Sequence, residues 1–156
     1  MGAVEERLTT LGLELPEPVA PVAAYVPAVA TGNLLWISGQ VPFVDGTPAE
    51  TGKVGEGDGL VSPARARECA AICALNALAA AKAELGDLDR VTRVVKLVGF
   101  VASSPDFTGQ PGVVNGASEL LGDVFGEQGR HARSAVGVAA LPLDVPVEVE
   151  LVLEFA

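Results

Sequence analysis

Hydrophobic and polar residues alternate through residues 130–155 in the pattern of two β-strands. From Val145 to Phe155 every second residue is apolar, and Glu148 is one of three glutamates between them. In the preceding strand Arg133 shares a face with alanine and glycine residues, because strand side chains repeat every second position. A proline-containing break from Leu141 to Asp144 predicts the turn. An arginine and a glutamate are thus expected to converge beside a shallow surface with room for a ligand, although both residue types are also common on solvated sheet faces.

Apolar stripes at helical spacing predict three helices. The first is short and covers residues 4–11. The second begins at the helix-starting pair Ser62–Pro63 and runs to about Leu85, where Gly86 supplies a left-handed stop. The third runs from about Gly109 to Phe125. The second helix has a face of alanine and cysteine residues, which allows a close approach to a sheet.

The remaining apolar segments predict strands. Apolar residues on both sides of Thr31–Asn33 indicate a β-hairpin, and a β-branched run indicates a strand ending near Ala102. This order predicts an α+β single domain over residues 1–156, in which a mixed β-sheet carries two long helices on one face and a short N-terminal helix. The two β–helix–β passages favour parallel neighbouring strands. Residues 1–20 are expected to form the N-terminal helix and linker, and residues 45–62 a glycine-rich loop with at most a short strand.

Composition and charge narrow the function classes. Hydrophobic residues make up 49% of the chain and the mean hydropathy is +0.41, yet no apolar run approaches the roughly 18 residues that span a membrane. The surplus apolar surface is expected in a subunit interface. A net charge of −10 disfavours nucleic acid as a partner. The acidic start of the chain does not resemble a secretory signal, so a cytoplasmic location is expected.

Metal and redox sites are not predicted. Cys69 and Cys73 lie four residues apart, without the Cys-x-x-Cys or Cys/His spacing of a metal or redox site. They are expected to be small buried hydrophobic residues. Both cysteines and His131 are predicted to be dispensable for function. The glycine-rich loop is acidic and lacks the phosphate-binding motifs, so phosphate binding is not expected there.

The closing string H-A-R-S-A-V-G-V-A-A-L-P-L-D-V-P-V-E-V-E resembles the final motif of the RidA/YjgF family, the reactive-intermediate imine deaminases, also classified as the L-PSP endoribonuclease family. It contains Arg133 and Glu148. Upstream, Tyr25 and the S-G-Q string at Ser38–Gln40 match the opening of the family. The segment from Phe107 to Asn115 resembles its D-F-x-x-x-N segment with several additional residues. The resemblance covers nearly the whole chain after the N-terminal linker.

This resemblance implies the chorismate mutase-like fold, a homotrimer, and a site in the cleft between neighbouring subunits. The implied reaction is hydrolysis of an imine or enamine of the 2-aminoacrylate type to a 2-keto acid and ammonia, without a metal or organic cofactor. Arg133 would bind the substrate carboxylate through two parallel hydrogen bonds, and Glu148 would position and activate the attacking water. The implied substrate-binding positions are Tyr25, Ser38, Gly39, Phe107 and Asn115.

Two other functions remain open. An endoribonuclease or translation inhibitor is attached to the family by name, but His131 is the only histidine, so the chain has no His/His or His/Lys pair. A non-catalytic carboxylate-binding module would keep the pocket without the reaction. Many family members have a cysteine two residues after the arginine, where this chain has Ala135. A thiol at that position therefore takes no part here.

Overall fold

The structure is a computed structural model that describes residues 1–21 and 23–156. Its α-helices are α1 (Ala3–Thr10), α2 (Pro63–Leu85) and α3 (Gln110–Phe125), and its 3-10 helices are η1 (Leu88–Arg90), η2 (Gly126–Gly129) and η3 (Pro142–Asp144). The strands are β1 (Ala28–Thr31), β2 (Leu34–Gln40), β3 (Phe43–Val44), β4 (Thr47–Pro48), β5 (Val91–Ala102), β6 (Ala132–Val138) and β7 (Val147–Phe155). Among the described residues, no helix is both long enough and apolar enough to cross a membrane.

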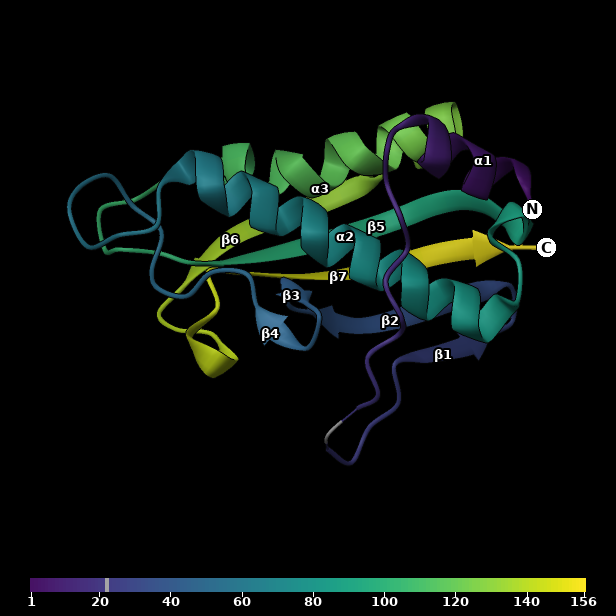
Figure 1. The fold of residues 1–156 in the computed structure, drawn as a ribbon, viewed down its shortest axis with the longest axis horizontal. Helices are drawn as coiled ribbons and strands as arrows, with labels where there is room; N and C mark the ends of the chain where they lie inside the picture. Colours follow the sequence, from purple (N-terminus) through teal and green to yellow (C-terminus); the bar gives the residue numbers. More distant parts are fainter. Residues whose placement is uncertain (22) are drawn as a thin grey trace.

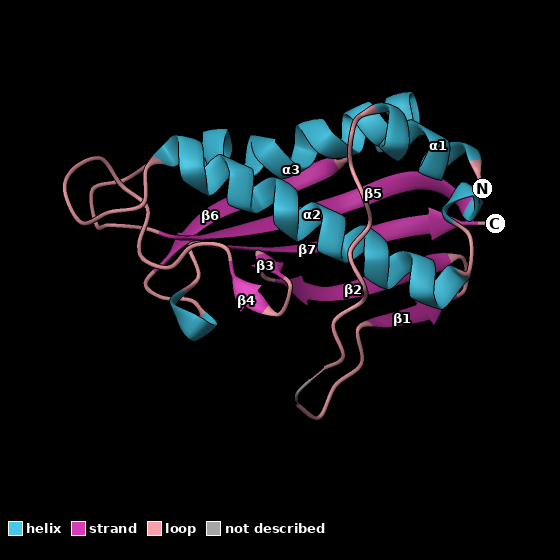
Figure 2. Ribbon diagram, viewed as in Figure 1, coloured by secondary structure: helices cyan, strands magenta, loops and turns pink. Residues whose placement is uncertain are grey.

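The main sheet has the strand order β1-β2-β7-β5-β6. β5 and β6 run parallel with α3 as their connection, and the other neighbouring pairs are antiparallel. α2 and α3 lie side by side on one face (Figures 1 and 2), which confirms the predicted α+β architecture. The passage from β2 through α2 to β5 does not produce parallel neighbours, because β7 inserts between these two strands and pairs with both.

The boundaries of α2 agree with the sequence prediction. The Ser62 hydroxyl accepts a hydrogen bond from the Arg65 backbone N at 3.1 Å, and Gly86 ends the helix with a φ of 80°. Cys69 and Cys73 are fully buried free thiols, as predicted, and burial raises the pKa of both. Ser62 and Gly86 are therefore local sequence features that determine where α2 begins and ends.

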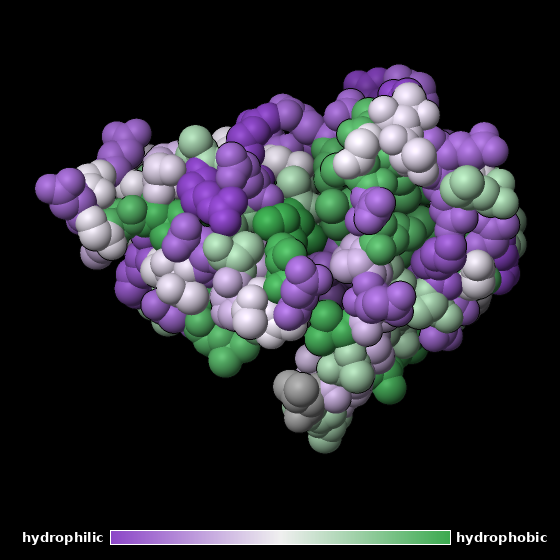
Figure 3. Space-filling view, in the orientation of Figure 1, coloured by the Kyte–Doolittle hydropathy of each residue, from purple (hydrophilic) through white to green (hydrophobic). Residues whose placement is uncertain are grey.

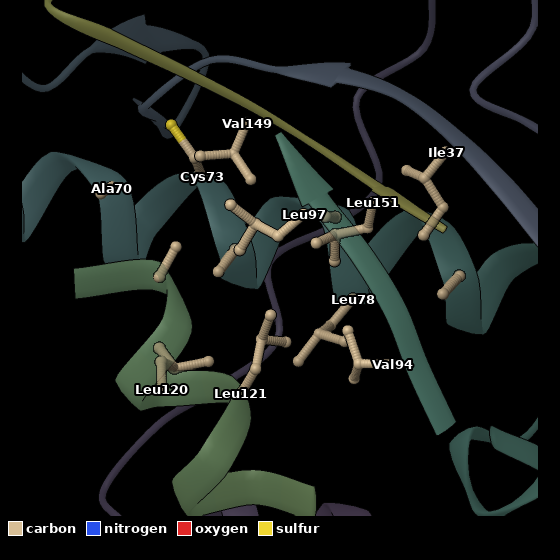
Figure 4. Close-up of a cluster of buried hydrophobic side chains, with 14 of the residues drawn as sticks. Ile37, Ala70, Cys73, Leu78, Val94, Leu97, Leu120, Leu121, Val149 and Leu151 are labelled. Atoms are coloured by element: carbon tan, nitrogen blue, oxygen red, sulfur yellow. The ribbon is translucent and has the colours of Figure 1, made fainter. Parts of the chain in front are cut away.

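The hydrophobic core lies between the sheet and the two long helices (Figure 4). Leu97 of β5 and Leu151 of β7 meet Leu78 of α2 and Leu121 of α3, and each of these side chains is at most 1% exposed. Complete burial of one such leucine stabilises the fold by about 1.5 to 3 kcal/mol. In β7 every second residue faces this core, and the glutamates between them leave the sheet on the other face.

The N-terminal helix α1 docks onto the domain, as predicted, through Leu8, which is 2% exposed. The carboxylate of Asp89, in η1, accepts hydrogen bonds from Ala3 N at 2.7 Å and Val4 N at 2.8 Å. The following linker crosses α2 (Figure 1), and apolar residues gather there on the surface (Figure 3). A distant aspartate thus supplies the N-terminal cap that the residues preceding α1 do not.

The glycine-rich loop contains little regular structure, in agreement with the prediction. β3 and β4 form a two-residue ladder, and the fully buried Val54 bridges to Val61 and Ser103. The predicted hairpin is also present: β1 and β2 pair in antiparallel fashion around a turn in which Gly32 has a φ of 59°. The turn of the hairpin and the glycine-rich loop lie at opposite ends of the sheet (Figure 1).

The face of the sheet opposite α2 and α3 carries exposed apolar side chains. Trp36 is 53% exposed, its cross-strand neighbour Val29 52%, and Val136 of β6 44%. These residues alternate along their strands with residues that face the helices. Val29 and Trp36 are neighbours near one edge of the sheet, and Val136 lies on the strand at the other edge.

Candidate functional site

A pocket of about 240 Å³ lies at the end of β2, and Glu148 is one of its walls. Tyr25 lines it from the segment before β1, Gly39 from β2 and Leu143 from η3. Tyr25 and Gly39 are two of the substrate-binding positions implied by the sequence. A single chain therefore places Tyr25 and Gly39 beside Glu148, the residue that the family resemblance implies for water activation.

Gly39 lies at an irregularity in the pairing between β2 and β7. Ser38 and Gly39 together stand opposite Glu150 alone, so β2 contains one extra residue at this point. Such β-bulges bend a strand and redirect its backbone. A Cβ added to Gly39 would lie 2.2 Å from Glu148 Oε1, so a side chain at this position would require the Glu148 carboxylate to move. The S-G-Q string thus brings the main chain of β2 against the Glu148 carboxylate.

The Glu148 carboxyl group is suited to proton transfer. Burial raises its pKa, and the negative charge of Glu150 raises this pKa further. Within the described part of the chain no hydrogen bond or ion pair holds the carboxylate, and no group of three or more His, Cys, Asp or Glu side chains could hold a metal ion. A half-buried carboxylate with a raised pKa can accept a proton and return it.

Asn76 supports the pocket, and the sequence analysis did not identify it. Its Nδ2 donates hydrogen bonds to Val41 O at 2.9 Å and Phe43 O at 3.1 Å. The residue is only 5% exposed and fixes the backbone between β2 and β3, which forms part of the pocket wall. The available signal was an amide among the alanine and cysteine residues of α2, because buried amides require partners.

Arg133 belongs to a second group of side chains, beside α3. Its Nη1 donates to Asn115 Oδ1 at 2.7 Å and to Ser118 Oγ at 3.2 Å, and its Nη2 donates to Pro111 O at 3.4 Å. The sequence nominated Arg133 and Asn115 separately, and the fold brings them into direct contact. Nε has no acceptor among the described residues, so the side of the guanidinium formed by Nε and Nη2 is available to a ligand.

A single chain does not bring Arg133 and Glu148 together. β5 lies between their strands: Arg133 stands opposite Leu97, and Glu148 opposite Phe100. Leu97 faces the core, and three residues along a strand reverse the direction of the side chain. Arg133 therefore reaches the helix side and Glu148 the open side. The convergence expected from the sequence does not occur within one chain, because β6 and β7 follow each other in the sequence but are separated by β5 in the sheet.

The two remaining predicted positions differ in their surroundings. Ser38 Oγ donates to Val26 O at 2.6 Å and so ties β2 to the segment that carries Tyr25. Phe107 lies elsewhere, in a cavity of about 460 Å³ that it lines with Gln110 and other residues. Ser38 thus supports the Glu148 pocket, whereas Phe107 is in neither group.

Comparison with known sequences identifies relatives over almost the whole chain. The profile of the family described as "YjgF/chorismate mutase-like, putative endoribonuclease" matches residues 5–155. Protein TCP17 of Trypanosoma cruzi is 47% identical over 154 residues, which are 98% of this chain and 94% of that protein. A RutC family protein of Pyrococcus abyssi is 31% identical over 137 residues, which are 88% of each chain.

Solved structures show the same fold. A protein of unknown function from Agrobacterium tumefaciens superposes with a TM-score of 0.90 at 49% identity, covering 98% of this chain and 92% of the other. A putative endoribonuclease from Shewanella oneidensis MR-1 gives a TM-score of 0.93 at 32% identity, covering 99% and 100%. RidA from an Antarctic Psychrobacter gives 0.60 at 28% identity, covering 89% and 94%.

Proposed function

The chain belongs to the YjgF/chorismate mutase-like family, and we propose that it hydrolyses reactive imines and enamines of the 2-aminoacrylate type to a 2-keto acid and ammonia. The observation that carries this proposal is the Glu148 carboxylate, half-buried against the main chain of Gly39 in a small pocket with Tyr25. The similarity to RidA supports this proposal, and so does Arg133, because the Nε side of its guanidinium has no acceptor among the described residues.

In this proposal Arg133 binds the substrate carboxylate. Nη1 donates to Asn115 and Ser118 and Nη2 donates to Pro111 O, so Nε–H and the second proton of Nη2 remain for a ligand. Two parallel donors match the two oxygens of a carboxylate, which a lysine could not do. Hydrogen bonds to charged groups contribute about 1.5 to 3 kcal/mol each. A 2-imino acid and the resulting 2-keto acid carry the same carboxylate, so both are ligands.

Glu148 carries out the proton transfers. An enamine first takes a proton from solvent on its methylene carbon and becomes an iminium ion, whose carbon is electrophilic without help from a metal. Glu148 removes a proton from water while the water oxygen bonds to this carbon and the C=N π pair moves to nitrogen. It then returns the proton to nitrogen and the C–N bond breaks. Ammonia leaves while the hydroxyl gives its proton to the Glu148 carboxylate, which passes it to solvent, and the ketone forms. A raised carboxyl pKa serves both directions of transfer.

The proposed site is shared between copies of the chain in a homotrimer. Arg133 and Glu148 leave opposite faces of one sheet, so a substrate that touches both must lie between two chains. The exposed Trp36 and Val136 on the open face support such an assembly, since burying them removes apolar surface from water. A neighbour's Arg133 then completes the pocket around Glu148.

An endoribonuclease function, suggested by the name of the Shewanella relative, has less support in this chain. The net charge of −10 repels a polyphosphate, and the single histidine cannot form a His pair. A non-catalytic carboxylate-binding module would keep Arg133 and the pocket but would not use Glu148 for proton transfer.

The decisive experiment generates 2-aminoacrylate from serine with a dehydratase and follows ammonia release. We expect the purified protein to accelerate release over buffer and Glu148→Gln to remove this acceleration. Binding of 2-oxobutanoate without acceleration would instead indicate a non-catalytic binding module. RNA cleavage by a nuclease-free preparation that is lost in Glu148→Gln would replace the proposal with a nuclease.

A further inference from the structure

We propose that Ser118 and His131 are positioning residues for Arg133, which hold its guanidinium so that the side formed by Nε and Nη2 faces the carboxylate of the substrate. The inference rests on the proposed function and deepens it. Ser118 lies outside the strings that carry the family resemblance, and His131 is the first residue of the closing string, where the resemblance assigns it no role. Their contribution comes from a chain of hydrogen bonds that begins at Arg133 and ends at a backbone carbonyl.

The residues of this hydrogen-bond series lie on two surfaces that face each other, one at β6 and one on α3. His131 directly precedes β6 and is two residues before Arg133, and both side chains contact Ser118 of α3. Pro111, Asn115 and Ser118 are spaced four and three residues apart along α3, which places them in one row on the helix surface. The row and the strand face each other, because all three helix residues provide an acceptor for Arg133.

For a neutral imidazole, the donor and acceptor chemistry of the partners determines the direction of each hydrogen bond in this series. His131 Nδ1 lies 2.6 Å from Gly129 O, and because a carbonyl only accepts, Nδ1 carries the ring proton. In the neutral ring Nε2 is then an acceptor, and it lies 2.9 Å from Ser118 Oγ. Ser118 therefore donates its single hydroxyl proton to His131. Its lone pairs remain for Arg133 Nη1 at 3.2 Å.

Gly129 O, the last acceptor in the hydrogen-bond series, is held in place by close packing. Gly129 is buried, and a Cβ placed on it would lie 2.4 Å from Leu121 O, so η2 packs directly against the last turns of α3. Gly129 O is thus a fixed acceptor for His131. A fixed imidazole orients the Ser118 hydroxyl, and a fixed hydroxyl holds Nη1 at a second point besides Asn115. Ser118 thus adds a third contact to those that Asn115 and Pro111 O make with the guanidinium, and this contact further restricts its rotation in its own plane.

This arrangement changes the expectation for His131. The sequence predicted a dispensable residue, because a lone histidine has no catalytic partner. In the structure His131 contacts no reacting group, and it acts on binding through Ser118 and Arg133. Loss of this control should weaken carboxylate binding while the chemical step at Glu148 continues, since binding groups positioned before the reaction act on KM more than on kcat.

The first test measures the affinity of the full-length protein for 2-oxobutanoate by calorimetry, together with KM and kcat for 2-aminoacrylate. Ser118→Ala and His131→Phe should each raise Kd and KM by about 3- to 10-fold, the effect of one net hydrogen bond, and leave kcat nearly unchanged. His131→Gln should recover most of the affinity, because its side-chain carbonyl can accept from Ser118. Thr10→Ala removes a hydroxyl that bonds only within α1 and is the matched control, expected to be unchanged.

The second test needs no substrate. Nitrogen-15 NMR of the imidazole should show the Nδ1–H tautomer in the wild type, and a shifted Nε2 signal in Ser118→Ala. The opposite tautomer would overturn the inference. So would an active wild type whose Ser118→Ala variant keeps its affinity and KM, and in that case the proposed function stands. A wild type with the Nδ1–H tautomer that neither binds 2-oxobutanoate nor releases ammonia instead removes the proposed function, and the positioning of a carboxylate clamp falls with it.

Discussion

Glu148 and Gly39 contact each other so closely that each residue limits the other. A side chain at position 39 would overlap the carboxylate, which lies 2.2 Å from the position of a Cβ. The sequence predicted that both residues belong to a site, through the S-G-Q string and the closing motif. It could not predict the contact, because this depends on the extra residue of β2 opposite Glu150, a property of strand pairing rather than of either segment. Asn76 was missed for the same reason, since its acceptors come from a distant turn.

Substitutions at Arg133 and Glu148 should fail in different ways. Arg133→Ala removes the carboxylate clamp, so both turnover and measurable affinity for 2-keto acids should be lost. Glu148→Gln keeps the shape of the side chain and can still hold a water but cannot accept its proton, so ligand binding should persist while the rate falls by roughly 10²- to 10⁴-fold. Calorimetry beside the 2-aminoacrylate assay separates the two. Unchanged activity in Glu148→Gln would remove the water-activation role, and unchanged affinity in Arg133→Ala the clamp.

The raised pKa of Glu148 also has a consequence for stability. Folding favours the protonated carboxyl, so its contribution to stability is fully present below the unfolded-state pKa and is lost as the pH rises through the folded-state pKa. Glu148→Gln should therefore melt at a higher temperature than the wild type near pH 7, and this difference should disappear toward about pH 4, where the glutamate is protonated. Thermal unfolding across this range tests the sign. A difference that is constant with pH would mean that burial does not penalise the charge.

At the scale of elements, local signals were sufficient for the helices and insufficient for the sheet. Ser62 and Gly86 mark the ends of α2 because a cap and a left-handed residue act through their immediate neighbours. The order of strands depends on pairing between distant segments. β7 follows β6 in the sequence but pairs with β2 and β5, which places Arg133 and Glu148 on opposite faces instead of in one cleft.

α1 should depend on Asp89. Hydrogen bonds from Val4 N and Ala3 N lower the pKa of this carboxyl, so its contribution is present above the unfolded-state pKa and is lost as the pH falls through the lower folded-state pKa. Asp89→Ala should increase amide exchange in α1, and acidification should do the same in the wild type but not in the variant. Hydrogen–deuterium exchange measures both. The control is Asp106→Ala, which removes an acceptor from Ser104 far from α1. Equal exchange of α1 in Asp89→Ala and wild type would show that the contact with Leu8 alone holds the helix.

At the scale of the whole molecule, one copy of the chain leaves two features incomplete. The open sheet face exposes apolar side chains, and the groups around Arg133 and Glu148 do not meet. Relatives with TM-scores of 0.90 and 0.93 share the arrangement of the whole chain, whereas RidA aligns over 89% of it with a TM-score of 0.60, so corresponding elements are placed differently there. Assembly and activity of this chain are therefore best tested directly.

A trimer would complete both features if the open face of each chain packed against the neighbour's β6 edge, where Arg133 lies. Each chain has a mass of 15.8 kDa, and sedimentation equilibrium at micromolar concentration should return three times that value. A stable interface buries at least about 1,000 Å² per pair, and Trp36, 53% exposed on this face, should contribute to it. Trp36→Glu places a charge there and should dissociate the assembly and abolish ammonia release together, whereas Thr10→Glu adds the same charge on the exposed N-terminal helix and should do neither. A monomeric wild type that still releases ammonia would separate activity from assembly and require Arg133 and Glu148 to act apart. A trimer that survives Trp36→Glu would place the interface on another surface.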